Sequence, residues 1–197
     1  NSVLNSAHSP RSNALDGLIP IHHEKDGTKT YWYRQNQGGG KFAYSKQFDV
    51  DMDCNDGPRY AIADFNNDGL DDFFCLKGAS SVWVSLNQGG NPPKFKSIGQ
   101  VVGKHDGYEA TDVRIADIDG DGRADYCLVQ DNGAVICSRN GGTGDKYAWQ
   151  GFKTAKGLRE TVFDKNSGAN KSGVVFADLN GDFRDEYLWV SDTGSVH

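Results

Sequence analysis

The sequence predicts an all-β fold made of β-propeller-type blades, with about four repeats of 50–60 residues, the last of them incomplete. Three observations support this prediction. A nine-residue acidic motif recurs along the chain, each full copy leads into a short β-rich run, and Gly-rich segments close the units. Repeats of about 50 residues with several short strands are typical of propeller blades, because their faces can be buried only against neighbouring blades.

The acidic motif is best preserved from Asp117 to Asp125, where Asp occupies positions 1, 3, 5 and 9. Residues 64–72 have the same spacing, residues 178–186 nearly repeat it, and residues 16–18 match part of it. Oxygen ligands on alternate residues of a tight turn converge on one point, which suits a hard cation such as Ca²⁺. Position 12 is never the Glu that an EF-hand requires. The motif therefore predicts calcium loops between strands, and a polar turn without metal is the alternative for any single copy.

The predicted calcium ligands occupy positions 1, 3, 5, 7 and 9 of each loop, with the carbonyl oxygen at position 7. They are Asp64, Asn66, Asp68, Leu70 and Asp72; Asp117, Asp119, Asp121, Arg123 and Asp125; and Asp178, Asn180, Asp182, Arg184 and Glu186. The first two loops follow the pattern in full. In the third, Phe183 replaces the turn Gly and Glu186 replaces Asp, which could distort the site or empty it. Two calcium ions are expected, and occupancy of the third loop stays open.

The strands recur in the same order in successive repeats. Aromatic and β-branched residues predict them at 31–33, 73–76, 82–84, 126–129, 134–137 and 187–190. Residues 131–133 are predicted to form a hairpin turn, and Gly-rich corners are expected at 36–42, 87–90 and 140–142. The repeats are predicted to span residues 12–53, 54–105, 106–165 and 166–197, after an N-terminal arm or linker at 1–11.

The last repeat stops at His197, within its returning hairpin strand, so its blade is expected to be unfinished. Three ways of completing it are open. The N-terminal residues could close it, the chain could be part of a longer protein, or a neighbouring molecule could donate the missing strands. The last alternative would allow self-association into a structural assembly.

Three segments carry a family resemblance: Ile62–Gly69, Ile115–Gly122 and Phe176–Asp182. With the loops around them they resemble FG-GAP or VCBS repeats, known from integrin-like propellers and secreted microbial proteins, over residues 12–197. The segments Asp53–Gly57 and Asp121–Cys127 are similar to propeller domains of secreted fungal proteins, often attached to SGNH-type esterases or other hydrolases. The resemblance implies a propeller fold and calcium. It also implies a possible accessory role beside a hydrolase, and relatives that include calcium-bearing propeller lectins.

Composition excludes several classes of partner. The chain has 37% hydrophobic residues and no apolar run near the ~20 residues of a membrane-spanning helix, so membrane insertion is not expected. The formal charge of −6 and the lack of a basic stripe make a nucleic acid an improbable partner.

The four cysteines indicate an oxidising, extracellular location together with the calcium loops. Cys127 and Cys137 lie equally far from Asn132 at the turn, which places them opposite each other, and Cys54 would then bond Cys75. A buried free Cys75 is the alternative. The single sequon predicts N-glycosylation at Asn170, in a polar stretch suited to a surface loop of a secreted protein.

The sequence offers little to catalysis. It has no G-x-S-x-G elbow, H-E-x-x-H helix or Gly-Asp-Ser block, and calcium-bound carboxylates make poor proton-transfer groups. We therefore expect a non-catalytic, secreted, calcium-stabilised module that binds carbohydrate, in a lectin-like manner, or protein. Trp149 and Tyr147 are the candidate ligand-binding aromatics, because Trp149 lies outside the register that predicts packing for Trp32 and Trp83.

Overall fold

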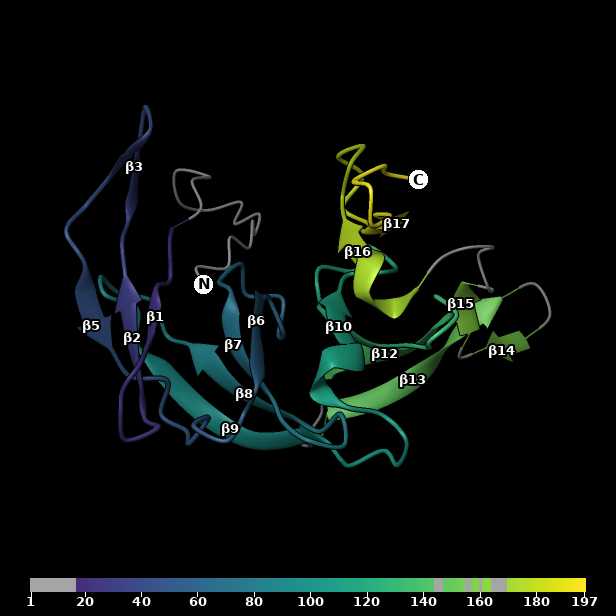
Figure 1. Cartoon of the computed structure of the whole chain (residues 1–197), viewed down its shortest axis with the longest axis horizontal. Coiled ribbons are helices and arrows are strands. Elements are labelled where there is room, and N and C mark those ends of the chain that lie inside the picture. Colours follow the sequence, from purple (N-terminus) through teal and green to yellow (C-terminus); the bar gives the residue numbers. More distant parts are fainter. Residues whose placement is uncertain (1–16, 144–146, 155–156, 160, 164–169) are drawn as a thin grey trace. The chain divides into compact units, whose positions relative to one another are not determined.

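The computed structural model describes residues 17–143, 147–154, 157–159, 161–163 and 170–197. It divides into two compact units: the first contains residues 1–64 and 68–106, and the second contains residues 65–67 and 107–197. Over the described residues the regular elements are antiparallel strands and two short 3-10 helices (Figure 1). The predicted all-β fold with blade-type sheets is thereby confirmed.

Between residues 17 and 106, the first unit holds three sheets. Strands β1 (Ile21–His23), β2 (Lys29–Tyr33) and β5 (Lys46–Phe48) form one of them in the order β1-β2-β5, and β3 (Asn36–Gly38) pairs with β4 (Lys41–Phe42) in another. The third is an antiparallel meander of β6 (Arg59–Ala63), β7 (Asp72–Leu76), β8 (Val82–Asn87) and β9 (Phe95–Val102). A four-stranded meander of this kind is the unit of a propeller blade.

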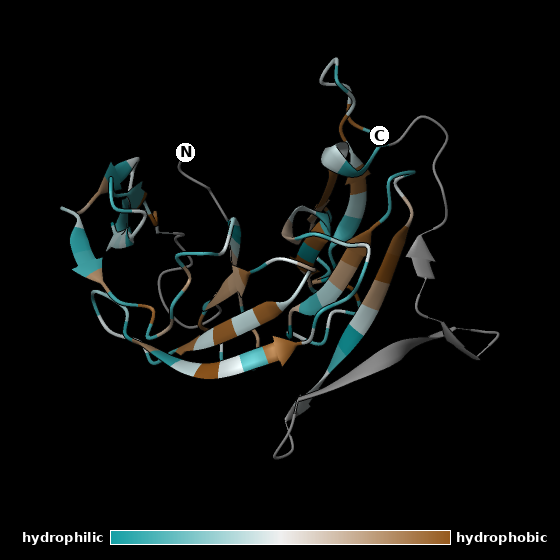
Figure 2. Ribbon diagram, turned by 60° about the horizontal axis from the view of Figure 1, so that its bottom comes forward, coloured by the Kyte–Doolittle hydropathy of each residue, from teal (hydrophilic) through white to brown (hydrophobic). Residues whose placement is uncertain are grey.

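The core of the first unit explains why its strands are apolar. Every residue of β7 is buried, and neighbouring Phe73 and Phe74 point to opposite faces with no exposed surface. The ring of Phe73 meets that of Tyr31 edge-on at 5.2 Å between centroids, which joins the β7 sheet to the sheet of β2. Apolar bands alternate with polar ones along strands of the meander (Figure 2). Such burial of whole aromatic side chains contributes roughly 2–3 kcal/mol each.

The second unit repeats the arrangement. Strands β10 (Val113–Ala116), β11 (Asp125–Val129), β12 (Val135–Thr143), β13 (Tyr147–Thr154) and β14 (Gly157–Arg159) lie in that order, and β15 (Thr161–Phe163) also pairs with β12. Strands β16 (Val174–Ala177) and β17 (Glu186–Trp189) form a further pair. The 3-10 helices η1 (Ala110–Asp112) and η2 (Lys171–Gly173) directly precede β10 and β16. Like β7, β11 is buried along its whole length.

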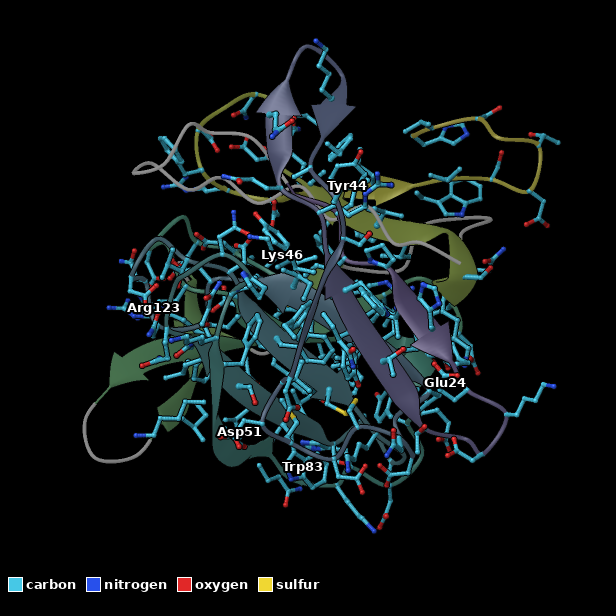
Figure 3. All side chains as sticks on the ribbon, turned by 90° about the vertical axis from the view of Figure 1, so that its left-hand side faces the viewer. Glu24, Tyr44, Lys46, Asp51, Trp83 and Arg123 are labelled. Carbon is cyan, nitrogen blue, oxygen red and sulfur yellow. A yellow bond between two sulfur atoms is a disulfide. The ribbon has the colours of Figure 1, made fainter. Side chains whose placement is uncertain are left out.

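Two disulfides form, as expected from the sequence, and the second of them joins two paired strands. Cys127 lies directly opposite Cys137 in the β11–β12 register, and the two Cα atoms are 4.1 Å apart. Cys54 bonds Cys75 across a Cα separation of 5.8 Å in the first unit. Sulfur is drawn in yellow in Figure 3. All four cysteines are buried, so each disulfide is part of a core.

The prediction of Gly-rich corners was wrong for two of the three segments, 36–42 and 140–142, which form other structures. Residues 140–142 belong to β12, where the register shifts between Asn140 and Thr143. The shift arises because Asn140 bends the strand: its Oδ1 accepts the Gly142 N–H at 3.2 Å, and Gly142 has a φ of 78°. Residues 36–42 form the tight β3–β4 hairpin instead of an open corner.

Candidate functional site

The loop between β10 and β11 gathers three carboxylates. Among the described residues, one oxygen each of Asp117, Asp119 and Asp125 lies within 4.8 Å of the other two. Asp125 has no exposed surface, and the other two are half-buried. An arrangement of this kind can hold a metal ion.

The backbone of this loop is organised around Asp117. Its Oδ1 accepts the N–H of Gly120 at 2.9 Å and of Asp121 at 3.3 Å, and its Oδ2 accepts the N–H of Gly122 at 2.8 Å. Asp121 Oδ1 in turn accepts the N–H of Arg123 at 2.9 Å. These bonds require the chain to coil tightly. Gly120 and Gly122 make this possible with left-handed φ values of 74° and 84°.

Asp125 closes the loop from the first residue of β11. Its Oδ2 accepts the N–H of Ile118 at 3.0 Å, and its Oδ1 accepts the N–H of Asn140 at 2.7 Å. Burial raises the pKa of Asp125 to about 8 and that of Asp117 to about 6, against the hydrogen bonds that lower both. The buried carboxylate of Asp125 and the half-buried ones of Asp117 and Asp119 need positive charge nearby to remain charged together.

Arg139 of β12 supplies positive charge at the same place. Its guanidinium forms an ion pair with Asp119 through Nε and with Asp121 through Nη2, and Asp121 also accepts from Arg123 at 2.9 Å. Asp119 Oδ1 is buried and has no hydrogen-bond partner among the described residues. Asp121 is not one of the three grouped carboxylates, and its Oδ2 pairs with Arg139 and Arg123.

The donor set fits calcium. Three carboxylates provide hard oxygen ligands, and the orphaned Oδ1 of Asp119 is a buried acceptor that a cation would satisfy. Asp117, Asp119 and Asp125 would hold the ion, and its chemistry would be charge neutralisation and cross-linking of the loop. The Asp121 carboxylate and the position-7 carbonyl of Arg123 remain predicted ligands.

The loop of residues 64–72 uses the same hydrogen-bonded turn. Asp64 accepts the N–H of Asp68 at 3.3 Å and of Gly69 at 2.7 Å, and Asp68 accepts the N–H of Leu70 at 2.9 Å. Asp72, at position 9, is fully buried in β7. The carboxylates at positions 1, 5 and 9 are thus held as in the second loop, while calcium binding by them and by Asn66 stays a prediction.

The loop of residues 178–186 keeps the turn despite Phe183. The Phe183 N–H bonds Asp178 Oδ2 at 2.9 Å, as the Gly122 N–H bonds Asp117, and Phe183 adopts a left-handed φ of 68°. Glu186 reaches back to the Leu179 N–H at 2.8 Å and to Asn180 Nδ2 at 3.0 Å. The longer Glu side chain therefore takes the place of Asp at position 9, and the backbone of this loop is not distorted.

Residues of this third loop also contact the second loop, within the same unit. Asp185 Oδ2 accepts the N–H of Asp117 at 2.8 Å, and the Asp185 N–H donates to the Asp117 carbonyl at 2.8 Å. Arg184 Nε donates to the Asp119 carbonyl at 3.3 Å. Burial raises the pKa of Asp185. The Arg184 side chain thus links the third loop to the second, in addition to the calcium binding predicted for the Arg184 backbone carbonyl.

The sequence analysis missed four residues that shape these loops, namely Asn87, Arg139, Asn140 and Asp185. Asn87 and Asn140 carried a usable signal, because each follows the position-9 acid of its own repeat by 15 residues. Asp185 carried a weaker signal, because position 8 of the first loop is also acidic, Asp71, but position 8 of the second loop is Ala124. Arg139 had no such signal, since Leu86 is at the matching place in the first unit.

Other predicted site residues lie away from the loops. Trp149 and Tyr147 belong to β13, but their side chains lie outside the described residues. Asn170 caps η2, where its Oδ1 accepts the N–H of Ser172 at 3.1 Å and of Gly173 at 3.2 Å. Glycosylation of its Nδ2 stays a prediction.

A cavity of about 450 Å³ opens in the second unit, at the turn between β11 and β12. The turn residues Gln130, Asp131 and Asn132 line it together with Tyr108 and Lys171. Because β11 runs from the acidic loop at Asp125 to this turn at Val129, the cavity and the loop lie at opposite ends of the same strand, roughly 13 Å apart.

Comparison with known proteins identifies the class of protein. The family of FG-GAP-like repeats matches residues 64–128 and 117–189, which includes all three acidic loops. The chain belongs to this family of repeat domains.

Solved structures share the fold. A lectin of Agrocybe aegerita that recognises non-reducing terminal N-acetylglucosamine superposes with a TM-score of 0.55, at 22% identity over 88% of this chain and 46% of the lectin chain. The Tc holotoxin pore of Photorhabdus luminescens gives a TM-score of 0.55, at 20% identity over 93% of this chain and 8% of the toxin chain. This chain thus spans about half of the lectin and a small part of the toxin. No curated protein sequence matches it significantly.

The helices of the structure are short. Over the described residues, none is long and apolar enough to span a bilayer.

Proposed function

We propose that the chain is a secreted, calcium-stabilised and non-catalytic module that binds carbohydrate. The proposal that the chain binds calcium rests on the convergence of Asp117, Asp119 and Asp125 on one point of a hydrogen-bonded loop. The same turn in two further loops, around Asp64 and Asp178, supports a repeated structural role. Ions in these loops would fix the ends of β7, β11 and β17 against the preceding strands.

Comparing the melting temperature of the protein in calcium and in chelator tests the proposed calcium binding directly. Calcium added to chelated protein is expected to raise it, because the ion binds the folded chain in preference to the unfolded one. Asp125→Asn removes one ligand charge from the second loop and is expected to reduce the increase. Asp131→Asn is the matched control, since Asp131 is an exposed turn residue outside the loops. Equal melting temperatures in calcium and in chelator would contradict the proposal.

Secretion is supported by the two disulfides, because such bonds form and persist in oxidising compartments. Millimolar calcium outside cells agrees with loops of this kind. A peptide map of the natural protein, recorded without reductant, tests both the disulfides and the glycan predicted at Asn170.

The carbohydrate part is supported by the fold shared with the Agrocybe aegerita lectin and by the polar cavity beside Tyr108. Binding to immobilised saccharides in calcium, and its loss in chelator, is the test. A non-catalytic role agrees with the loop carboxylates, whose oxygens are held by backbone N–H groups. Assays on acetylated sugars should show no hydrolysis, and an accessory role beside a hydrolase is compatible with that result.

Protein binding is the second candidate, and one observation favours it. Leu179 and Phe183, two large apolar residues of the third loop, are 65% and 64% exposed. A partner or a second copy of the chain could cover them, as in the self-association predicted from the sequence. Light scattering of the native chain and of Phe183→Ser tests this: assembly that the substitution abolishes would favour protein contact over carbohydrate binding.

A further inference from the structure

The cavity at the β11–β12 turn is walled by a fixed set of charges. Lys171 Nζ lies 3.1 Å from Asp112 Oδ1 and 2.9 Å from Asp131 Oδ1. Asp112 has a side chain only 5% exposed, and its Oδ2 accepts the Glu109 N–H at 2.9 Å. Among the residues that line the cavity, two carboxylates thus face one ammonium group, so the lining itself carries a net negative charge, with the Arg114 guanidinium behind Asp112.

Arg114 holds the two sides of this wall together. Its Nη2 donates to the Lys171 carbonyl at 2.9 Å and its Nε donates to the Val174 carbonyl at 2.9 Å. Its Nη1 donates to the Thr111 carbonyl at 2.8 Å. One rigid guanidinium therefore ties η1 to η2. These bonds restrain the lining residues of η1 and η2, and such restraint reduces the entropic cost of binding a ligand.

The remaining wall offers groups that recognise hydroxyls. Gln130 and Asn132 carry amides that can both donate and accept, and Asn132 is oriented because its Oδ1 accepts the Ala134 N–H at 3.0 Å. Tyr108 adds an aromatic side chain at the rim. The volume of about 450 Å³ lies within the range of small-ligand sites.

We propose that this cavity is the saccharide site of the chain and that it takes a neutral or amino-bearing sugar unit, rejecting acidic ones. The inference rests on the carbohydrate binding proposed above and names its site and its ligand class. Carboxylates accept hydroxyl or ammonium protons, so Asp112 and Asp131 favour such ligands. An acidic sugar would place a third negative charge beside them, where the single Lys171 is already paired.

The test uses the full chain in calcium and four immobilised probes, which are oligosaccharides ending in glucose, N-acetylglucosamine, glucosamine or sialic acid. We expect at least one of the first three probes to bind and the sialylated probe not to bind. Tyr108→Ala should weaken binding at least tenfold. Tyr44→Ala is the matched control, because Tyr44 is 94% exposed, lies in the first unit between β4 and β5, and should leave affinity unchanged (Figure 3).

A charge reversal completes the test. Asp131→Lys changes an exposed turn residue, so melting temperature should be preserved, and it makes the wall net positive. Binding of the sialylated probe should appear in this variant. Saccharide binding that neither Tyr108→Ala nor Asp131→Lys alters would overturn the cavity proposal while leaving the carbohydrate function intact. Native protein that binds none of the probes, but binds a protein partner, would remove the carbohydrate function itself.

Discussion

Asn140 donates its backbone N–H to Asp125 Oδ1 at 2.7 Å, and Asn87 makes the same 2.7 Å bond to Asp72 in the first unit. Each Asn side chain also donates to the carbonyl that precedes the acid, at 3.2 Å from Asn140 to Ala124 and at 2.9 Å from Asn87 to Asp71. The third strand of each meander, β8 or β12, therefore holds the carboxylate at position 9 of its loop by hydrogen bonds that need no cation. Loop and sheet form one hydrogen-bonded unit.

Replacing Asn140 by Ala should destabilise the chain by about 2–3 kcal/mol, because buried carbonyls of Phe65 and Ala124 lose their donor. Asn87→Ala should cost less, about 1 kcal/mol, since Asn87 is partly exposed and its side chain donates to one carbonyl. Urea unfolding of both variants measures the difference. Equal losses of unfolding free energy in the two variants would mean that the burial of Asn140 does not strengthen the contribution of its hydrogen bonds.

Much of the fold could be predicted from the sequence because the repeats are local. Strands 73–76 and 126–129 follow each acidic loop directly, and the symmetric turn around Asn132 placed Cys127 opposite Cys137. The Gly-rich segment at 140–142 failed as a corner because glycine marks bulges as well as turns. A bulge depends on the partner strand β13, which sequence periodicity does not reveal.

The site was harder to predict than the fold. The spacing of Asp117, Asp119 and Asp125 was enough to place them together, because all three belong to one loop. Arg139 comes from β12, and only the register of the sheet brings it to Asp119. Phe183 was expected to disturb its turn, yet the hydrogen bonds to Asp178 hold it in the left-handed conformation. The position of Arg139 and the conformation of Phe183 therefore both depend on contacts with residues elsewhere in the fold.

Gly122→Ala should destabilise the chain by about 2–3 kcal/mol. Its φ of 84° disfavours any side chain by about 1 kcal/mol, and a Cβ would lie 2.5 Å from Asn67 Oδ1. That approach would break the 3.0 Å bond from Asn67 Nδ2 to the Asp121 carbonyl. Gly27→Ala is the control for φ alone, since Gly27 has a φ of 87° and nothing within 4 Å.

The excess cost of Gly122→Ala should vanish in an Asn67→Gly background, which removes the clashing side chain and tolerates the left-handed φ of 59°. Thermal unfolding of the single and double variants gives the coupling. If the excess persisted without the Asn67 side chain, the contact would not be its cause.

Calcium stabilisation should increase with pH. Burial raises the folded-state pKa of Asp117 to about 6 and of Asp125 to about 8, above the value of about 4 in an unfolded chain. Without metal, the stability that these groups contribute is fully present below about pH 4 and is lost as pH rises through 6 and 8. Calcium must displace the same protons, so its affinity rises over this window.

The measurement is the difference in melting temperature between calcium and chelator, from about pH 5 to about pH 9. Asp125→Asn should flatten the upper part of the profile, because it removes the group that titrates near 8. A difference that did not change with pH would show that neither carboxylate is protonated in the metal-free fold.

Arg139→Leu should strengthen calcium binding by the second loop. The guanidinium pairs with Oδ2 of Asp119 and with Oδ2 of Asp121, so it competes with a calcium ion for the negative charge of both carboxylates. Leu86 precedes Asn87 as Arg139 precedes Asn140, so the first unit has an apolar residue at the matching place. Loss of one charge-assisted bond, about 1.5 kcal/mol or more, corresponds to about tenfold in affinity.

The stability of Arg139→Leu relative to the native chain should depend on calcium. In chelator its melting temperature should fall, because Asp119 and Asp121 lose their counter-charge beside two other carboxylates. In saturating calcium the tighter binding should offset this loss. Lys104→Leu removes an exposed cation from the first unit and should leave the calorimetric affinity unchanged. Weaker calcium binding by Arg139→Leu would instead mean that the guanidinium positions the carboxylates for the ion, because pure competition allows only a gain.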